Sequence, residues 1–573
     1  MRRFFPTLVA AVLIAAAVGT VILLAGDDDD PKKGPSVTNG DGSETRPPQG
    51  PLPKAGYLRQ ACELPHEWVE RVYRGWDAHG TVRDDDLALV PHPPHYMGTR
   101  FNTSHSGPYD FLQKVPLVLY GPGFIEPQGN KDIGREATIA DIAPTIAKLM
   151  RFDGWEQGPT ARPLEEVLRS TESSPKLIVT AVVDGGGWNA LEHWPDAWPN
   201  IQRLIDEGVN IDGAIVGSSP SITPATHTNL STGAFPRQHA ITAIVVRGDD
   251  DKLTEAFSLT KNSGSGSMNP TVHLRMNTIA DDWDLATDNV AQIGAVIPGS
   301  YQIGLVGHGS ALEGADKDIV LAYSNRRSWT TTTEFYSMPS YVNRVVGGPE
   351  PEIEAVDRAD GVADGKWGDH EITKIEPTPA FAPWENRSMQ AVIEREGFGD
   401  DDVTDLFFVN YKSPDAAGHL YNMIGPEQED VLKSVDTAVG DMIEFLDDEV
   451  GEENYVFILT ADHGQTPLGA GGYPISRTEL LEDIAARFDG IDNDLRVTEQ
   501  TSASEIFLRK EELKANRLTS DEVATWLARY TIGDNLTEGA TAEEFADRKD
   551  EPIFDAVIPG GKLPKVARCV GVL

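Results

Sequence analysis

Basic residues are scarce in this chain of 573 residues, in which 49 lysines and arginines face 90 aspartates and glutamates for a net charge of −41. Binding to nucleic acid needs a basic footprint, so this balance argues against sequence-specific nucleic-acid binding. The same acidity attracts divalent cations. Hydrophobic residues make up 40% of the chain, and we expect them to form a sizeable core.

Charge is missing altogether from one stretch near the N-terminus, which runs from Phe4 to Gly26 and follows Arg2 and Arg3. That length suits a membrane-spanning helix, and the flanking arginines place the rest of the chain outside the cytoplasm. No clear small-x-small cleavage site follows, so residues 1–26 are predicted to be an uncleaved membrane anchor. The alternative is a signal segment that is removed, which would make the protein secreted. Residues 27–56 lack apolar content and are predicted to form a disordered linker.

Cysteine is nearly absent: the chain has two, Cys62 and Cys569, at opposite ends of the part expected to fold. An exported protein meets an oxidising environment, in which the two thiols can pair. We therefore expect a disulfide between them, although two unrelated thiols are the alternative.

Continuous apolar runs at 177–183, 405–411 and 455–461 are typical of strands buried in a parallel sheet, and helical patterns lie between them. This alternation predicts a doubly wound, largely parallel α/β sheet with flanking helices, which binds its ligands beyond the carboxyl ends of the strands. We expect residues 57–573 to form one catalytic domain. The region from about 250 to 400 looks too irregular for core sheet and is predicted to be a cap that selects substrate.

Carboxylates and imidazoles follow all three of these strands. Asp184 follows the first, Asp415 and His419 the second, and Asp462 and His463 the third. Because such strand ends meet at one edge of a sheet, these side chains are predicted to converge as ligands for a cation such as zinc.

Thr223 is the candidate nucleophile, in the segment SSPSITPATHTNLSTG (218–233). Pro224 is favoured at the first position of a helix, so Thr223 is predicted to be its N-cap. A hydroxyl there faces the positive end of the helix dipole, where a phosphate is stabilised, and a metal ion would lower its pKa. An ordinary capping threonine is the alternative.

These motifs together resemble the alkaline phosphatase superfamily, most closely its branch of nucleotide pyrophosphatase/phosphodiesterases and threonine-dependent phosphatases. The residues that carry the resemblance are Asp184, Thr223-x-x-x-His227, Asp415-x-x-x-His419 and Asp462-His463-Gly464. It implies two divalent metal ions, which we expect to be zinc. One would be held by Asp184, Thr223, Asp462 and His463, and the other by Asp415, His419 and a further histidine.

The further histidine normally comes last, in a His-Gly-x-Pro-Tyr-like turn before a Val-Pro-Leu strand. No such motif follows residue 464, but His105 stands in one, HSGPYDFLQKVPLVLYGPG. The chain therefore looks circularly permuted, with residues 57 to about 170 supplying the usual end of the domain. We expect the strand at 115–120 to enter the same parallel sheet as YVFILTA. A tandem remnant of a second phosphatase is the alternative.

Two departures limit the resemblance. The diesterase branch has an asparagine shortly after His-Gly-Ile, and HAITAIVV (239–246) offers none; Pro224 has no N–H to donate to a developing oxyanion. Other side chains must then contact the phosphoryl group. The candidates are Lys412, His308, Lys317, Arg326 and Arg327, of which Lys412 lies beside the Asp415 motif.

The expected function is a two-metal phosphoester hydrolase, of phosphodiesterase or phosphatase type, which acts through a phospho-threonine. Its substrate would be a phosphorylated small molecule or nucleotide. A phosphomonoesterase-only enzyme and an inactive, metal-binding adhesive ectodomain are the alternatives. A sulfatase is disfavoured because its nucleophile derives from cysteine or serine, and Thr223 cannot supply one.

Overall fold

The computed structural model describes residues 56–78, 83–99, 102–155, 161–257, 272–324, 326–491, 493–536 and 543–573. The predicted membrane anchor lies outside these residues, as does the predicted linker except for its last residue. Within the described ranges, no helix is both long and apolar enough to cross a membrane.

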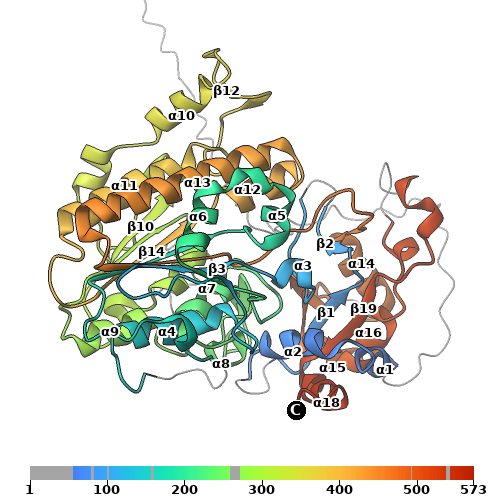
Figure 1. The fold of residues 1–573 in the computed structure, drawn as a ribbon. Helices are drawn as coiled ribbons and strands as arrows, with labels where there is room; N and C mark the ends of the chain where they lie inside the picture. The colour runs from blue at the N-terminus through green and yellow to red at the C-terminus, as the bar shows by residue number, and fades with distance from the viewer. Residues whose placement is uncertain are drawn as a thin grey trace, which may run out of the picture.

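The described residues form a larger and a smaller lobe (Figure 1). A nine-stranded sheet forms the centre of the larger lobe, in the order β11-β10-β9-β14-β5-β15-β3-β6-β4. The predicted buried runs lie at its middle as β5 (Leu177–Val183), β14 (Asp405–Tyr411) and β15 (Tyr455–Thr460), in which every residue is buried. The others are β3 (Leu117–Tyr120), β4 (Gly129–Lys131), β6 (Val209–Ile211), β9 (Ile293–Ile297), β10 (Ile319–Ser324) and β11 (Ser328–Thr330). Strands β10, β9, β14, β5 and β15 run parallel, which confirms the predicted largely parallel α/β fold.

Helices cover both faces of this sheet (Figure 1). One face carries α6 (Pro199–Glu207), α11 (Phe381–Glu396) and α13 (Pro426–Leu446), and the other carries α4 (Ile142–Leu149), α7 (Thr223–Thr232) and α9 (Ile279–Ala286). Side chains alternate between the faces along each strand: Val179 packs in the α11–α13 core, and Ile178 in the α4–α9 core. Both faces are thus apolar, which explains why the central strands read as continuous hydrophobic runs.

Strand β3 enters the same sheet as β15, as expected. It lies next to β15 and runs antiparallel to it, with Leu117 opposite Thr460 and Tyr120 opposite Phe457. The prediction of a parallel strand was wrong. The chain reaches β3 from the His105 segment, at the edge where the parallel strands end, so it must run back toward their amino ends. An antiparallel strand on a mostly parallel sheet is a common solution.

The predicted cap at about 250–400 needs a larger correction, because three of its segments form β9, β10 and β11 of the central sheet. These strands are short and separated by loops, which hid them in the sequence. What does project from the molecule is α10 (Glu350–Asp357) and the hairpin of β12 (Lys366–Trp367) and β13 (His370–Glu371) (Figure 1).

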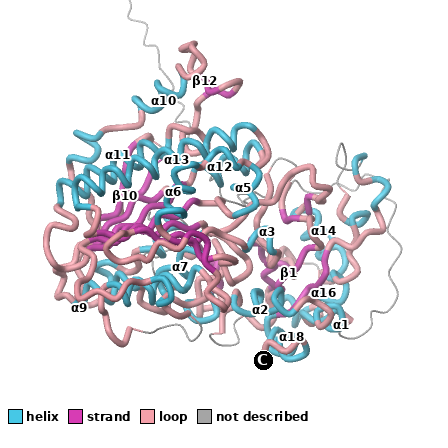
Figure 2. The backbone as a smooth tube through the Cα atoms, viewed as in Figure 1, coloured by secondary structure: helices cyan, strands magenta, loops and turns pink. Residues whose placement is uncertain are grey.

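A second, four-stranded sheet joins the two ends of the folded chain (Figure 2). Its order is β17-β18-β1-β19, and β1 (Leu87–Pro91) is antiparallel to both of its neighbours, β18 (Glu505–Leu508) and β19 (Phe554–Pro559). The remaining strand and the helices around it are β17 (Thr498–Ser502), α1 (Tyr57–Ala61), α2 (His66–Arg74), α14 (Arg477–Phe488), α15 (Lys510–Ala515), α16 (Ser520–Leu527) and α18 (Leu563–Cys569). Residues near 90 therefore share a core with residues beyond 500.

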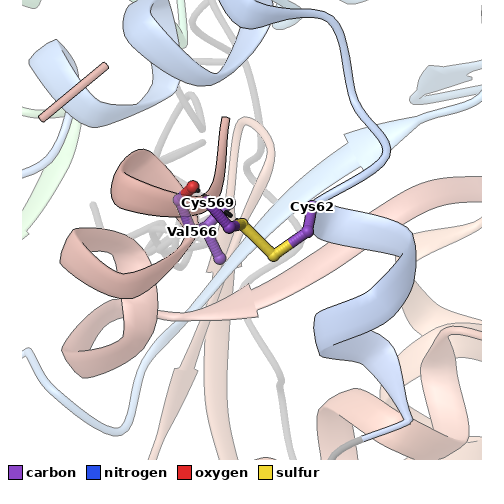
Figure 3. Close-up of a disulfide and its surroundings, with 3 residues drawn as sticks. All are labelled: Cys62, Val566 and Cys569. Carbon is purple, nitrogen blue, oxygen red and sulfur yellow. Dashed lines mark hydrogen bonds between the residues drawn. A yellow bond between two sulfur atoms is a disulfide. The ribbon is translucent and has the colours of Figure 1, made fainter. Parts of the chain in front are cut away.

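A disulfide closes this smaller lobe (Figure 3). It joins Cys62, directly after α1, to Cys569, the last residue of α18, with the two Cα atoms 5.7 Å apart. The expected cysteine pair is thus bonded across a sequence separation of 507 residues.

Candidate active site

The first group of candidate ligands lies at the carboxyl ends of β5 and β15. Asp184, Asp462 and His463 each offer a ligand atom, and these three atoms all lie within 4.8 Å of one another. Asp184 directly follows β5, and Asp462 accepts a 3.0 Å hydrogen bond from the Gly185 amide. All three side chains are buried.

A second group consists of His105, Asp415 and His419, whose ligand atoms also lie within 4.8 Å of one another. Asp415 and His419 stand one turn apart on α12 (Ser413–Tyr421), so they share a face of that helix. His105 comes from the loop before α3 (Asp110–Gln113), and its Nε2 atom lies 3.6 Å from Asp415 Oδ1. The fold thus brings His105 to residues more than 300 positions later in the chain.

The two groups adjoin one another. The imidazole rings of His105 and His463 are stacked, with centroids 3.5 Å apart and planes 11° apart. His463 Nε2 also lies 3.9 Å from Asp415 Oδ1, across the boundary between the groups. A pair of ions held by these six residues would therefore be neighbours.

Hydrogen bonds from Nδ1 fix the orientation of two of the histidine rings. His105 Nδ1 lies 2.7 Å from the Ser221 carbonyl oxygen, and His463 Nδ1 lies 2.9 Å from that of Gly464. A carbonyl oxygen only accepts, so Nδ1 of each ring carries the proton and Nε2 keeps its lone pair. His463 Nε2 and Asp462 Oδ2 are buried without a hydrogen-bond partner. Buried, unpaired carboxylate and imidazole donors fit a divalent metal ion.

Thr223 begins α7, in a segment that contacts both groups. Ser221, two residues earlier, binds His105 of the second group, and His227 Nδ1, one turn later, lies 3.7 Å from Asp462 Oδ2 of the first. The expected N-cap is off by one residue: Ile222 has extended backbone angles and is the N-cap, so Thr223 is the first helical residue and Pro224 the second. The threonine remains in the first turn, at the positive end of the helix dipole.

Lys412 occupies the centre of the site. Its Nζ atom lies 3.1 Å from Asp184 Oδ2 and 2.5 Å from Asp415 Oδ2, so it bridges a carboxylate of each group. Burial opposes its charge, but the carboxylates outweigh burial and raise the pKa of Lys412 above its ordinary value. Burial alone would raise the pKa of Asp415, and Lys412 and His419 instead hold it well below its usual range.

Burial shifts His463, His105 and Asp184 toward their neutral forms. It lowers the pKa of His463 to about 4 and that of His105 well below its ordinary value. Burial and the neighbouring Asp462 raise the pKa of Asp184 well above the usual range. Neutral imidazoles are the form that binds metal, while a cation in the first group would favour the charged form of Asp184.

Two supporting residues escaped the sequence analysis. Asn410 Nδ2 donates a 2.8 Å hydrogen bond to Asp184 Oδ2, and Gln465 Nε2 donates to the carbonyl oxygens of Gly185 and Pro414. A polar residue inside the apolar run DLFFVNY was the one available signal for Asn410. Nothing local distinguishes Gln465, because its partners come from two other strand ends.

His308 and Lys317 have partners elsewhere. His308 Nδ1 lies 2.9 Å from Asp281 Oδ2 on α9, and Lys317 Nζ donates to the Thr333 carbonyl oxygen at 2.6 Å. Within the ranges that the structure covers, neither side chain has a hydrogen bond or ion pair with the two groups. The structure therefore gives no support to the expectation that they bind substrate.

A largely parallel α/β sheet with carboxylate and imidazole donors at its carboxyl edge is typical of metal-dependent hydrolases of phosphoric esters. Residues 178–530 match the model of the family described as Type I phosphodiesterase / nucleotide pyrophosphatase, and the chain belongs to this family. This result confirms the resemblance to the alkaline phosphatase superfamily and identifies the protein as a phosphoric ester hydrolase.

Relatives are distant. A protein of Myroides odoratus named calcium-transporting ATPase is 25% identical over 61% of this chain and 72% of its own length. Alkaline phosphatase PhoV of Synechococcus elongatus is 23% identical over 56% of this chain and 65% of its own. Alkaline phosphatase PafA of Elizabethkingia meningoseptica is 25% identical over 51% of this chain and 60% of its own length. A crystal structure of wild-type alkaline phosphatase PafA aligns with a TM-score of 0.46 and 18% identity, over 63% of this chain and 77% of that one.

Proposed function

We propose that the protein hydrolyses esters of phosphoric acid on phosphorylated small molecules or nucleotides, with Thr223 as the nucleophile. The segment that carries Thr223 supports this proposal, because residues on either side of the threonine contact the two groups of candidate ligands. Its neighbours Ser221 and His227 contact one group each, so the hydroxyl belongs to the segment that joins them. Two of the relatives named above are alkaline phosphatases, which supports the same class of reaction.

The chain offers donors for two divalent ions. Asp184, Asp462 and His463 would hold one, and His105, Asp415 and His419 the other. The Thr223 hydroxyl would be a fourth ligand of the first ion. Oxygen and imidazole donors of this kind suit zinc. When bound, two such ions supply positive charge that stabilises the attacking and leaving oxygens of a phosphoryl transfer.

The reaction proceeds in two displacements at phosphorus. Thr223 Oγ1 gives up its proton and forms a bond to phosphorus, while the bond from phosphorus to the ester oxygen breaks and the alcohol leaves with a proton. Water then attacks the phospho-threonine, the bond to Oγ1 breaks, and the threonine regains a proton. The positive end of the α7 dipole stabilises the phosphoryl oxygens throughout.

Lys412 is a positioning residue in this scheme. The sequence suggested that it contacts substrate, but its ammonium group is bound to Asp184 and Asp415. Held there, it reduces the repulsion between the buried carboxylates and fixes their orientation before substrate arrives.

Replacement of the nucleophile tests the proposal. Thr223→Ala should lose hydrolysis of p-nitrophenyl phosphate and bis-p-nitrophenyl phosphate by orders of magnitude while it keeps its fold and most bound metal. Thr223→Ser is the matched control, because it retains the attacking oxygen and should retain measurable turnover. Turnover of the alanine variant within a few-fold of wild type would overturn the assignment, and the ratio of the two substrates in wild type decides between mono- and diesterase.

We propose that the chain is circularly permuted, with residues 57 to about 170 in the place of the usual end of the domain. Two observations support it: His105 lies against Asp415, and β3 lies beside β15. The family match starts at residue 178, next to the start of β5.

We also propose an extracytoplasmic location, with residues 1–26 as membrane anchor. The disulfide supports it, because such bonds persist in oxidising compartments. Release of the protein from washed membranes by salt alone would contradict the anchor.

A further inference from the structure

A third cluster of carboxylates lies away from the candidate active site. Asp284, Asp316 and Asp318 each place one oxygen so that the three atoms lie within 4.8 Å of one another. Asp284 comes from α9, and the other two come from the segment that leads into β10. The cluster therefore joins a helix on one face of the sheet to the first residues of a strand.

Its position separates it from the catalytic chemistry. Asp318 directly precedes β10, which runs parallel to β9 and β14, so the cluster lies at the amino ends of these strands. The candidate active site follows their carboxyl ends. A strand as long as β14, with seven residues, spans about 23 Å, so the two sites lie at opposite edges of the sheet.

Nothing in the described part of the chain balances the charge of this cluster. Lys317, between two of the aspartates, donates to the Thr333 carbonyl oxygen instead, and His308 pairs with Asp281. Asp284 is 2% exposed and Asp318 is 7% exposed. Asp284 Oδ1 is buried and has no hydrogen-bond partner, which a buried carboxylate oxygen rarely lacks without a bound ion or water.

Electrostatics agree with this geometry. Burial and the neighbouring Asp316 raise the pKa of Asp284 to about 6. Burial and the neighbouring aspartates also raise the pKa of Asp318 well above its usual range. Two buried carboxylates and an exposed one are thus held together at a cost that a divalent cation would offset.

We propose that Asp284, Asp316 and Asp318 form a calcium site that fastens α9 to the start of β10. The donors are all carboxylate oxygens, with no imidazole or thiolate, which favours a hard cation over zinc. Calcium takes six to eight oxygen ligands in flexible geometry, so water and backbone carbonyl oxygens would complete the shell. Magnesium demands near-octahedral geometry and loses its water reluctantly, so it should bind more weakly.

The test uses the full chain loaded with zinc and freed of calcium. Added calcium should bind at this site with about one ion per chain above the background of an Asp318→Asn variant, and should raise the thermal midpoint of wild type by several degrees. Asp318→Asn removes one repelling charge, so without calcium it should be at least as stable as wild type and should not respond to calcium. Hydrolysis should be unchanged in the variant when both proteins carry zinc.

A matched control and a direct probe complete the experiment. Asp288→Asn removes an exposed carboxylate just after α9 and should respond to calcium as wild type does. Terbium, which replaces calcium, should show luminescence sensitised by Trp283, next to Asp284, and Asp318→Asn should lose this signal. Equal responses to calcium in wild type and Asp318→Asn, or none in wild type, would overturn the proposal.

Discussion

Replacement of His105 by alanine tests the least expected part of our proposal, a metal ligand that comes from more than 300 residues before Asp415 and His419. His105 is one of three donors in its group, and its Nε2 atom lies 3.6 Å from Asp415 Oδ1. Without it, Asp415 and His419 alone would face the ion. Two protein ligands are too few for a structural or catalytic zinc site, so bound zinc should fall from about two ions per chain toward one.

The size of the expected loss in zinc affinity follows from what each donor contributes. Loss of a residue that only orients a ligand typically costs about 10- to 100-fold in metal affinity. His105 is placed to bind the ion directly, and its Nδ1 contact with the Ser221 carbonyl oxygen also ties this loop to α7. His105→Ala should therefore need more than about 100-fold more zinc than wild type for half-maximal activity.

The assay is a zinc titration of metal-free protein, followed by hydrolysis of p-nitrophenyl phosphate and by metal content after dialysis. His92→Ala is the control, since His92 belongs to the same N-terminal part of the chain and its half-exposed ring contacts Asp555 instead of either group. It should titrate as wild type does. If His105→Ala retains both ions and the zinc dependence of wild type, His105 is only a turn residue and the permuted arrangement is wrong.

Three further changes probe the supporting structure. Cys569→Ser should lower the free energy of unfolding by about 2–5 kcal/mol, because it releases the long loop that the disulfide closes, and urea titration measures the loss. Burial, which outweighs Arg83, raises the pKa of Glu505 from 4.5 to about 7, so this residue stabilises the fold below pH 4.5 and loses that contribution as the pH rises through 7. In wild type, the titration of Glu505 should lower the free energy of unfolding by about 3 kcal/mol between pH 4.5 and 7. Denaturation curves of Glu505→Gln should lack this fall. Asn410→Ala removes one of the two hydrogen bonds to Asp184 Oδ2, leaving that from Lys412, and should weaken metal binding or activity by about 10- to 100-fold in the zinc titration.

Each of these predictions has an outcome that contradicts it. Free thiols at both Cys62 and Cys569 in non-reduced peptides would contradict the prediction for Cys569→Ser, because there would be no disulfide to remove. Parallel pH profiles of wild type and Glu505→Gln would show that this carboxylate titrates alike in the folded and unfolded chains. An Asn410→Ala protein with unaltered zinc dependence would mean that Asp184 keeps its orientation without that hydrogen bond.

The amino-acid sequence by itself determined the centre of the fold and most of the candidate ligands. Strands β5, β14 and β15 consist mostly of apolar residues because both faces of the sheet are covered. Each of these segments can therefore be recognised as a buried strand from its own residues. The carboxylates and imidazoles of these motifs follow those strands directly or within two turns of a helix. Their convergence therefore follows from the rule that parallel strands end at one edge.

Tertiary structure decided what depends on partners far away in the chain. The direction of β3 follows from the edge at which the His105 loop leaves the site. The membership of β9 and β10 in the nine-stranded sheet follows from neighbours that their own five or six residues cannot specify. The same holds for Lys412, which looks in the sequence like a free cation beside a motif and in the fold bridges Asp184 and Asp415. A periodic pattern records whether a side chain is buried, whereas strand direction and charge pairing are set by which other segment arrives beside it.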